Sequence, residues 1–200
     1  MKTFKEYLKE EKVAEWPPKG VTYPPKTKED VAAMKPHIDR VVAMAKKLHT
    51  RYQQRNPRSW VNIIMHGNKF GKYNPPGVQK NPFRSLISRI VHYNDDPKKR
   101  PKPVQKTVPL KSLKPTQPGI DPDRPMPGNS DLLEFNSRNY LENPEKARTP
   151  NVDTYGPKDE NGKRNIGDGH NRIYALLILQ AAGVLSPDHE IVVNHYEKGN

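Results

Sequence analysis

The chain of 200 residues is long enough for one ordinary domain with an appendage or for two small domains. It contains no cysteine, which excludes disulfides and thiolate metal sites, and no apolar run approaches the roughly 18 residues that a membrane span needs. Only 32% of the residues are hydrophobic and 22 are proline, so we expect one compact core flanked by extended segments; the polar N-terminus predicts no secretory signal.

The net charge of +13 is concentrated in the first half of the chain. Residues 1–104 hold 23 Lys and Arg against 9 Asp and Glu, whereas residues 105–200 hold 12 against 13. A basic half joined to a neutral half favours a polyanionic partner, and nucleic acid is the commonest. We therefore expect residues 11–104 to bind nucleic acid without sequence preference; the alternative is that the charge serves solubility alone.

The first 26 residues are predicted to form a short helix followed by a spacer. Residues 2–14 place Phe4 and Leu8 on one side at helical spacing. The stretch "EWPPKGVTYPPKTKED" contains two Pro-Pro pairs, which exclude a helix and favour extended chain.

Residues 27–94 are predicted to form a basic helical region. Thr27 or Asp30 can cap a long helix that runs to about residue 55, with Pro36 in its first turns. The expected apolar stripe of this helix consists of Val31, Met34, Ile38, Val41, Ala45, Leu48 and Tyr52. A second helix is predicted in "NPFRSLISRIVHYND", and "SWVNIIMHGNKFGKYNPPG" before it favours a strand or a short helix.

The charged, proline-rich stretch over residues 95–104 is the expected linker to a second domain, residues 105–200. That domain is predicted to begin with a strand that breaks at Pro115 and to continue with a helix capped by Ser130. A turn at "DENGKRN", a buried helix and the closing strand "HEIVVNHYEK" follow. This order of elements predicts an α+β fold.

The stretch "NIGDGHNRIYALLILQAAGVL" combines a polar opening with a helix that has almost no solvated face. Asp168 is the expected N-cap and Gly183 the expected C′ residue. Unpaired backbone N–H groups at the helix start, the guanidinium of Arg172 and the adaptable side chain of Asn171 suit an anion, phosphate above all. The alternative is structural: Asp168 caps the helix and Arg172 pairs with a carboxylate.

The segments "VPLKSLKPTQ", "IGDGHNRIYALLILQAAG" and "EIVVNHYE" together resemble the ParB/sulfiredoxin superfamily over residues 106–197. Members often carry a strand ending near Pro-Thr-Gln and a Gly-His-His-Arg-type box at the start of a helix; here Asn171 stands at the second histidine. The resemblance implies a small mixed fold in which the phosphate- or nucleotide-binding residues are Gly167, Gly169, Asn171, Arg172, Thr116 and Gln117. The cysteine of sulfiredoxin chemistry and the acidic and basic box of partition proteins are absent, and no helix-turn-helix follows.

Family members include nucleotide hydrolases, kinases and proteins described as nucleases. The resemblance therefore implies a nuclease or phosphoryl-transfer activity, with Mg²⁺ and a nucleoside triphosphate as candidate cofactors. His170 is the expected proton carrier, and Asp168 its catalytic partner or a Mg²⁺ ligand. The different-class alternative is a protein that coats DNA without turnover. An acidic residue close to His170, from among Asp121, Asp123 and Glu134, would favour the enzyme.

The first ten residues, "MKTFKEYLKE", resemble the capsid-targeting peptides of T-even-like phage internal head proteins. Such peptides end in a Leu/Ile-X-Glu site for the prohead protease, which Leu8 and Glu10 match. The resemblance implies a phage protein located in the head interior or in the host cytoplasm, with head or core proteins as further partners. The alternative is an ordinary amphipathic N-terminal helix.

If Met1–Glu10 is a packaging signal, mature particles are expected to contain a chain that begins at Glu11. The reason is that the prohead protease of the resembled proteins cuts after the Glu of this motif. Intact-mass measurement on virions tests the prediction, and a chain that retains Met1 in mature heads would contradict the processing.

Overall fold

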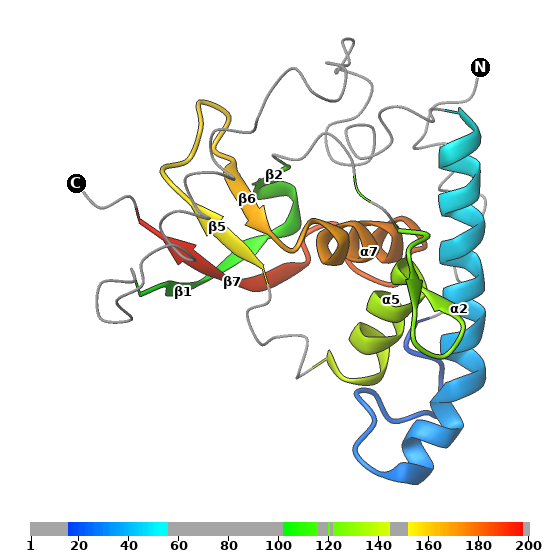
Figure 1. Cartoon of the computed structure of the whole chain (residues 1–200). Coiled ribbons are helices and arrows are strands. Elements are labelled where there is room, and N and C mark those ends of the chain that lie inside the picture. Colours follow the sequence, from blue (N-terminus) through cyan, green and yellow to red (C-terminus); the bar gives the residue numbers. More distant parts are fainter. Residues whose placement is uncertain (1–15, 56–101, 116–119, 121, 145–151, 198–200) are drawn as a thin grey trace. The chain divides into compact units, whose positions relative to one another are not determined.

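The computed structural model describes residues 16–55, 102–115, 120, 122–144 and 152–197, and side chains over these ranges except 52–55. Helices and strands together confirm the predicted α+β class (Figure 1). The chain forms two compact units. The first comprises Met1–Pro57, Asp121–Thr149 and Asn171–His189, and the second comprises Arg58–Ile120, Pro150–His170 and Glu190–Asn200. Each unit therefore draws on residues from both sides of the stretch 95–104.

The first unit is helical, and its longest element is α2 (Lys28–Arg55). The hydroxyl of Thr27 accepts the backbone N–H of Asp30 at 3.0 Å, and the Asp30 carboxylate accepts the N–H groups of Lys26 and Thr27, each at 3.0 Å. This reciprocal arrangement satisfies backbone donors that the helix itself leaves unpaired. Both predicted capping residues thus act together, and the predicted end of the helix near residue 55 is confirmed.

The apolar stripe of α2 is buried over most of its predicted length. The core residues that it supplies are Met34, Ile38, Val41, Val42, Ala45 and Leu48. Val31 was predicted to belong to the stripe but is 43% exposed, because it lies in the first turn, where the helix surface remains solvated. Pro36 lies in the helix interior rather than in the first turns, so the bond that its missing N–H would donate to the carbonyl of Ala32 is lost.

Within the described residues two further helices belong to this unit, and α2 runs alongside them in Figure 1. The helix α5 (Leu132–Glu142) follows a hairpin of β3 (Pro125–Met126) and β4 (Ser130–Asp131). The N-cap of α5 is Asp131, whose carboxylate accepts the N–H of Glu134 at 2.8 Å, and not Ser130 as predicted. Ser130 pairs with Met126 in the hairpin and donates its hydroxyl to Pro127, so the helix begins one residue later.

The third helix, α7 (His170–Ala181), is buried along nearly all of its length, as predicted. Its C-terminus is closed by Gly183, which has a φ of 82°. The N–H of Gly183 bonds to the carbonyl of Gln180 at 3.0 Å and that of Val184 to the carbonyl of Leu179 at 3.0 Å, which is the Schellman pattern. The predicted C′ glycine is confirmed. At the other end the predicted N-cap is wrong by one residue: Asp168 is the last residue of a strand, and Gly169 directly precedes the helix.

The second unit contains a five-stranded sheet with the order β1-β7-β5-β6-β2. Its strands are β1 (Val104–Pro109), β2 (Leu113–Lys114), β5 (Asp153–Tyr155), β6 (Arg164–Asp168) and β7 (Glu190–Tyr196). The neighbours β1 and β7, and β5 and β6, are antiparallel, whereas β7 and β5, and β6 and β2, are parallel. A short 3₁₀ helix, η4 (Leu110–Ser112), joins β1 to β2. The expected strand before Pro115 and the closing strand with its buried centre are confirmed.

The turn between β5 and β6 was predicted from its composition and is confirmed. Asp159 organises it: one carboxylate oxygen accepts the N–H groups of Asn161 and Lys163, each at 2.9 Å. Gly162 has a φ of 73°, a conformation that glycine adopts without steric cost. The turn returns the chain antiparallel to β5 and so positions β6, the strand that leads into α7.

Several predictions concern residues outside the described ranges. They are the N-terminal helix over residues 2–14, the segment 57–80, the helix that begins at Asn81, most of the linker 95–104, and Thr116 and Gln117. The cleavage site at Leu8 and Glu10 also lies there.

Candidate functional site

The box that was singled out in the sequence lies where a strand leads into a helix. Gly167 and Asp168 end β6, Gly169 has a φ of 89°, and His170 begins α7, with Asn171 and Arg172 in its first turn. Glycine adopts a positive φ more readily than any other residue does, so Gly169 allows the chain to turn from strand into helix. The sequence alone identified these residues as neighbours on the chain; the backbone shows the turn that they make.

The side chains of the box differ in exposure. Asp168 and Arg172 are exposed, whereas His170 is only 5% exposed. Asn171 is half-buried, and within the described part of the chain its buried side-chain oxygen has no hydrogen-bond partner. Because its amide can turn by 180°, Asn171 can offer either an acceptor or a donor at that point. The exposed guanidinium of Arg172 therefore lies in the same first turn as the backbone N–H groups that a helix leaves without intrahelical partners.

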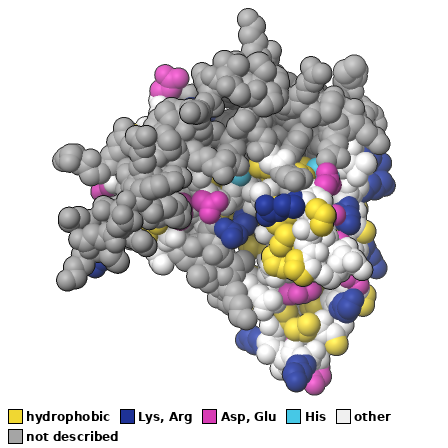
Figure 2. Space-filling model, in the orientation of Figure 1, with side chains coloured by type: hydrophobic (Ala, Val, Ile, Leu, Met, Phe, Trp, Pro, Cys, Tyr) yellow, Lys and Arg dark blue, Asp and Glu magenta, His cyan; other side chains and the backbone are white. Residues whose placement is uncertain are grey.

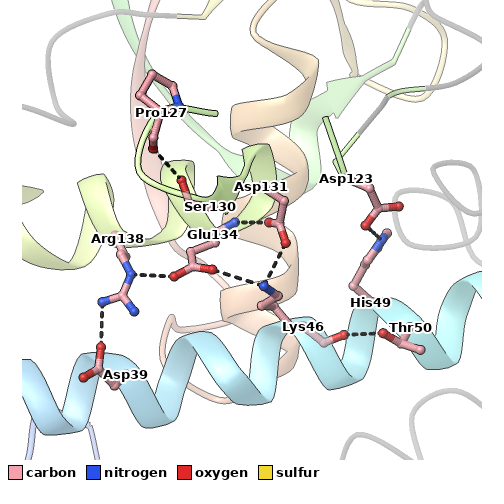
Figure 3. Close-up of polar contacts among 10 residues, drawn as sticks. All are labelled: Asp39, Lys46, His49, Thr50, Asp123, Pro127, Ser130, Asp131, Glu134 and Arg138. Atoms are coloured by element: carbon pink, nitrogen blue, oxygen red, sulfur yellow. Dashed lines mark hydrogen bonds and ion pairs between the residues drawn. The ribbon is translucent and has the colours of Figure 1, made fainter. Parts of the chain in front are cut away.

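Two of the acidic residues considered as partners of His170 have other partners in the first unit. Asp123 contacts His49, and Glu134 contacts Lys46 and Arg138 (Figure 3). Asp121 lies outside the described residues.

Glu134 belongs to a network of charges that joins α5 to α2 (Figure 3). The Lys46 ammonium lies 2.9 Å from Asp131 and 3.1 Å from Glu134, and the Arg138 guanidinium lies 2.9 Å from Glu134 and 2.7 Å from Asp39. Burial raises the pKa of Glu134, but its bonds to Arg138 and Lys46 outweigh burial and hold that pKa below its ordinary value. A carboxylate held in this way stays ionised and is suited to structural use rather than to proton transfer.

A chain of hydrogen bonds that no sequence pattern predicted runs from buried Tyr174 through buried His49 on α2 to the exposed carboxylate of Asp123. Its Nδ1 lies 2.7 Å from the hydroxyl of Tyr174, and its Nε2 lies 3.2 Å from the carboxylate of Asp123. A carboxylate only accepts, so Nε2 donates to Asp123, and in the neutral ring Nδ1 accepts from the Tyr174 hydroxyl. His49 and Tyr174 are 3% and 1% exposed, so this chain fastens the loop around Asp123 to two helices. The one feature of the sequence that could have indicated this contact is the position of His49, which follows Leu48 at the edge of the apolar stripe of α2.

A second polar cluster that was not anticipated lies on the sheet of the second unit. His195 on β7 is 2% exposed, with Nδ1 3.1 Å from the hydroxyl of Thr154 and Nε2 3.2 Å from Nη1 of Arg164. Arg164 and Thr154 lie on β6 and β5, which are adjacent strands. Three neighbouring strands therefore bring these side chains together.

Acidification is expected to destabilise the folded chain through both buried histidines. Burial lowers the pKa of His49 although Asp123 opposes the shift, and burial, Arg164 and Lys106 lower the pKa of His195. The unfolded chain takes up protons near the ordinary value of 6.5, but the folded chain does so only at lower pH. The free energy of unfolding is therefore at its full value above pH 6.5 and falls as the pH drops below it.

Urea unfolding at several pH values between about 7.5 and 5.5 measures this effect. The urea midpoint should fall with pH, and the variants His49→Gln and His195→Gln should each show a flatter dependence. A midpoint that is constant or rises on acidification would contradict the assignment of neutral histidines.

The carboxylate of Asp168 alone does not make a metal site. Among the residues that the structure describes, no group of three or more His, Asp and Glu side chains is arranged to hold a metal ion. Magnesium is commonly held by one or two carboxylates together with substrate phosphates. The role of Asp168 toward Mg²⁺ stays a prediction.

Comparison of the chain with protein-family models, with curated proteins and with solved structures finds no match. No helix within the described ranges has the length and apolar character needed to cross a membrane.

Proposed function

We propose that the first turn of α7, together with Gly169 before it, binds a phosphate group of a nucleotide or a nucleic acid. The observation that carries the proposal is the local backbone: a strand, a glycine with a φ of 89°, and a helix whose first turn bears the exposed Arg172. Backbone N–H groups and the positive end of the helix dipole favour an anion at this position. The guanidinium adds a fork of charge-assisted donors that matches phosphate oxygens.

The proposed activity is nuclease or phosphoryl-transfer chemistry in a phage protein with a ParB/sulfiredoxin-like domain. Its support is the resemblance of the box and its position at the start of a buried helix. His170 and Asp168 are the proposed catalytic residues. A thermal-shift screen of the full chain with ATP, CTP and GTP, each with Mg²⁺, identifies the nucleotide, since a ligand that binds only the folded state raises the unfolding temperature.

Replacing Arg172 with alanine is expected to weaken binding of the stabilising nucleotide by tenfold or more. Charge-assisted hydrogen bonds contribute about 1.5–3 kcal/mol, and Arg172 is exposed, so the fold is expected to survive. Isothermal titration of the full chain measures the affinity. Arg40→Ala, which removes one exposed positive charge from α2, is the matched control and should bind as the unmodified chain does. Unchanged affinity in a folded Arg172→Ala chain would overturn the phosphate site.

A second candidate function is that of a DNA-associated protein of the phage head interior that has no enzymatic activity. The observation that favours it is a basic stripe on α2, formed by Arg40, Lys47 and Arg51, all exposed. At about 100° per residue these positions fall within roughly 40° of one another on the helix surface, over a length of about 16 Å. Figure 2 shows Lys and Arg side chains along the side of the molecule on which α2 runs.

The part of α2 that carries this stripe adds no acidic residue to it. Residues 40–55 contain no Asp or Glu. Lys46 lies on a different side of α2 from the stripe and forms ion pairs with Asp131 and Glu134. A stripe of like charge along a helix suits the regular phosphates of a duplex and reads no base sequence. The salt dependence of binding tests this candidate and is developed in the Discussion.

A further inference from the structure

The polar cluster of the second unit lies on one face of its sheet. Thr154 is in register with His195 across the parallel pair β5 and β7, and with Ile166 across the antiparallel pair β5 and β6. Arg164 precedes Ile166 by two residues, so its side chain leaves β6 on the same face. The same face carries the buried apolar side chains of Val108, Leu113, Ile166 and Val193, and also Lys106, which is in register with Val193.

The protons of this cluster follow from what each group can donate. A guanidinium only donates, so Nη1 of Arg164 donates to Nε2 of His195. The proton of the neutral ring then lies on Nδ1, which donates to the hydroxyl of Thr154. Both ring nitrogens are thereby used, and His195 holds Arg164 in place from one side.

The hydrogen bonding of the Arg164 guanidinium differs at its Nε, away from the contact with His195. Its Nε is buried and has no hydrogen-bond partner among the residues that the structure describes. The carboxylate of Glu197, whose charge acts on the same histidine, is paired with Lys106 at 3.0 Å. A charged donor that is buried and unsatisfied is costly, since the group loses its hydration and receives nothing in return.

The edge formed by Nε and Nη2 is the side-on edge with which arginine binds the two oxygens of an oxyanion. His195 contacts Nη1, and the hydrogen-bonding capacity of Nε is unused among the described residues. Burial, Arg164 and Lys106 hold the pKa of His195 low, so the ring adds no positive charge beside the guanidinium. An anion would remove the cost of the buried Nε and balance the local positive charge.

We propose that Arg164 binds a small oxyanion through its Nε and Nη2 edge, with His195 and Thr154 as positioning residues. The chemistry shared by the ligands is two coplanar oxygen acceptors carrying negative charge, as in phosphate and carboxylate. The site is independent of the phosphate site proposed at α7, because it uses none of its residues.

The test is an NMR titration of the full chain, with the Nε–H signals of its arginines observed directly. Inorganic phosphate and acetate are added in separate arms, with sodium chloride adjusted to hold the ionic strength constant. A saturable shift of the Arg164 Nε–H signal is expected in at least one arm, and the arm with the lower Kd identifies the class of oxyanion. A response that does not saturate in either arm would overturn the proposal.

Variants separate this site from its alternatives. Arg164→Lys keeps the positive charge but loses the planar edge, and Arg164→Met keeps the side-chain length without the charge. For each variant the Kd for the oxyanion should rise at least tenfold. This Kd is measured from the backbone amide signals near β6, because the Arg164 Nε–H signal is lost. Thr154→Val should weaken binding less, by releasing the ring of His195. Arg172→Ala, which tests the α7 site, should leave this titration unchanged. Equal affinity in Arg164→Lys and the unmodified chain would show that Arg164 only braces His195.

Discussion

Raising the salt concentration from 50 to 200 mM is expected to weaken binding of duplex DNA by about a hundredfold or more. A cationic surface gains affinity by releasing the counterions condensed on phosphates, and each phosphate contact steepens the log–log salt dependence by about 0.9. About five contacts suffice for this effect, and the exposed stripe of Arg40, Lys47 and Arg51 supplies three of the side chains. Fluorescence anisotropy with one labelled duplex, titrated at several salt concentrations, measures the slope.

The full chain is the appropriate material for this measurement. A fragment such as 11–104 would separate α2 from α5 and α7, which belong to the same compact unit and contribute its ion pairs and the His49 contact. The informative variant is therefore Arg40→Glu with Lys47→Glu in the full chain, for which we expect a shallower slope. The matched control reverses two exposed lysines of the neutral half, Lys111 and Lys158, and should change the slope little. An equal effect of both pairs, or a flat salt response, would show that the stripe does not contact DNA.

Replacing Ile178 with alanine is expected to lower the free energy of unfolding by about 2–5 kcal/mol. Ile178 lies in α7 and is 0% exposed, so truncation removes buried methyl and methylene groups and leaves a cavity among its neighbours. Urea unfolding followed by circular dichroism measures the change. A loss of this size would remove much of the stability of an ordinary domain, which is about 5–15 kcal/mol.

Val31→Ala is the control for this truncation, because Val31 belongs to the same compact unit but is 43% exposed. We expect a change of no more than about 0.5 kcal/mol, since a solvated side chain gains little from burial and alanine favours the helix. Equal losses for the two variants would mean that α7 does not lie in the core.

Local patterns in the sequence predicted the features that neighbouring residues decide among themselves. The start of α2 at Thr27 and Asp30 follows from side-chain oxygens that reach backbone N–H groups within four residues. Gly183 closes α7 because the residue there needs a positive φ, and the near-continuous apolar run of that helix required burial. The position of the polar segment Gly167–Arg172 before this helix could be read from the same local signals.

Predictions for single residues failed where an adjacent hairpin or the end of a helix decides the outcome. Ser130 lost the N-cap to Asp131 because the β3–β4 hairpin uses it, and Val31 remained exposed although its spacing matches the stripe.

The sequence by itself thus determined the α+β class, the capping of α2 and the burial of α7, because hydrogen bonds and periodicity within a few residues specify them. Only the tertiary structure decided the partners of the buried histidines. His49 meets Tyr174 across 125 residues of sequence, and Arg164 meets His195 across 31. Such pairs depend on how helices pack and on which strands become neighbours, and no local spacing encodes that choice.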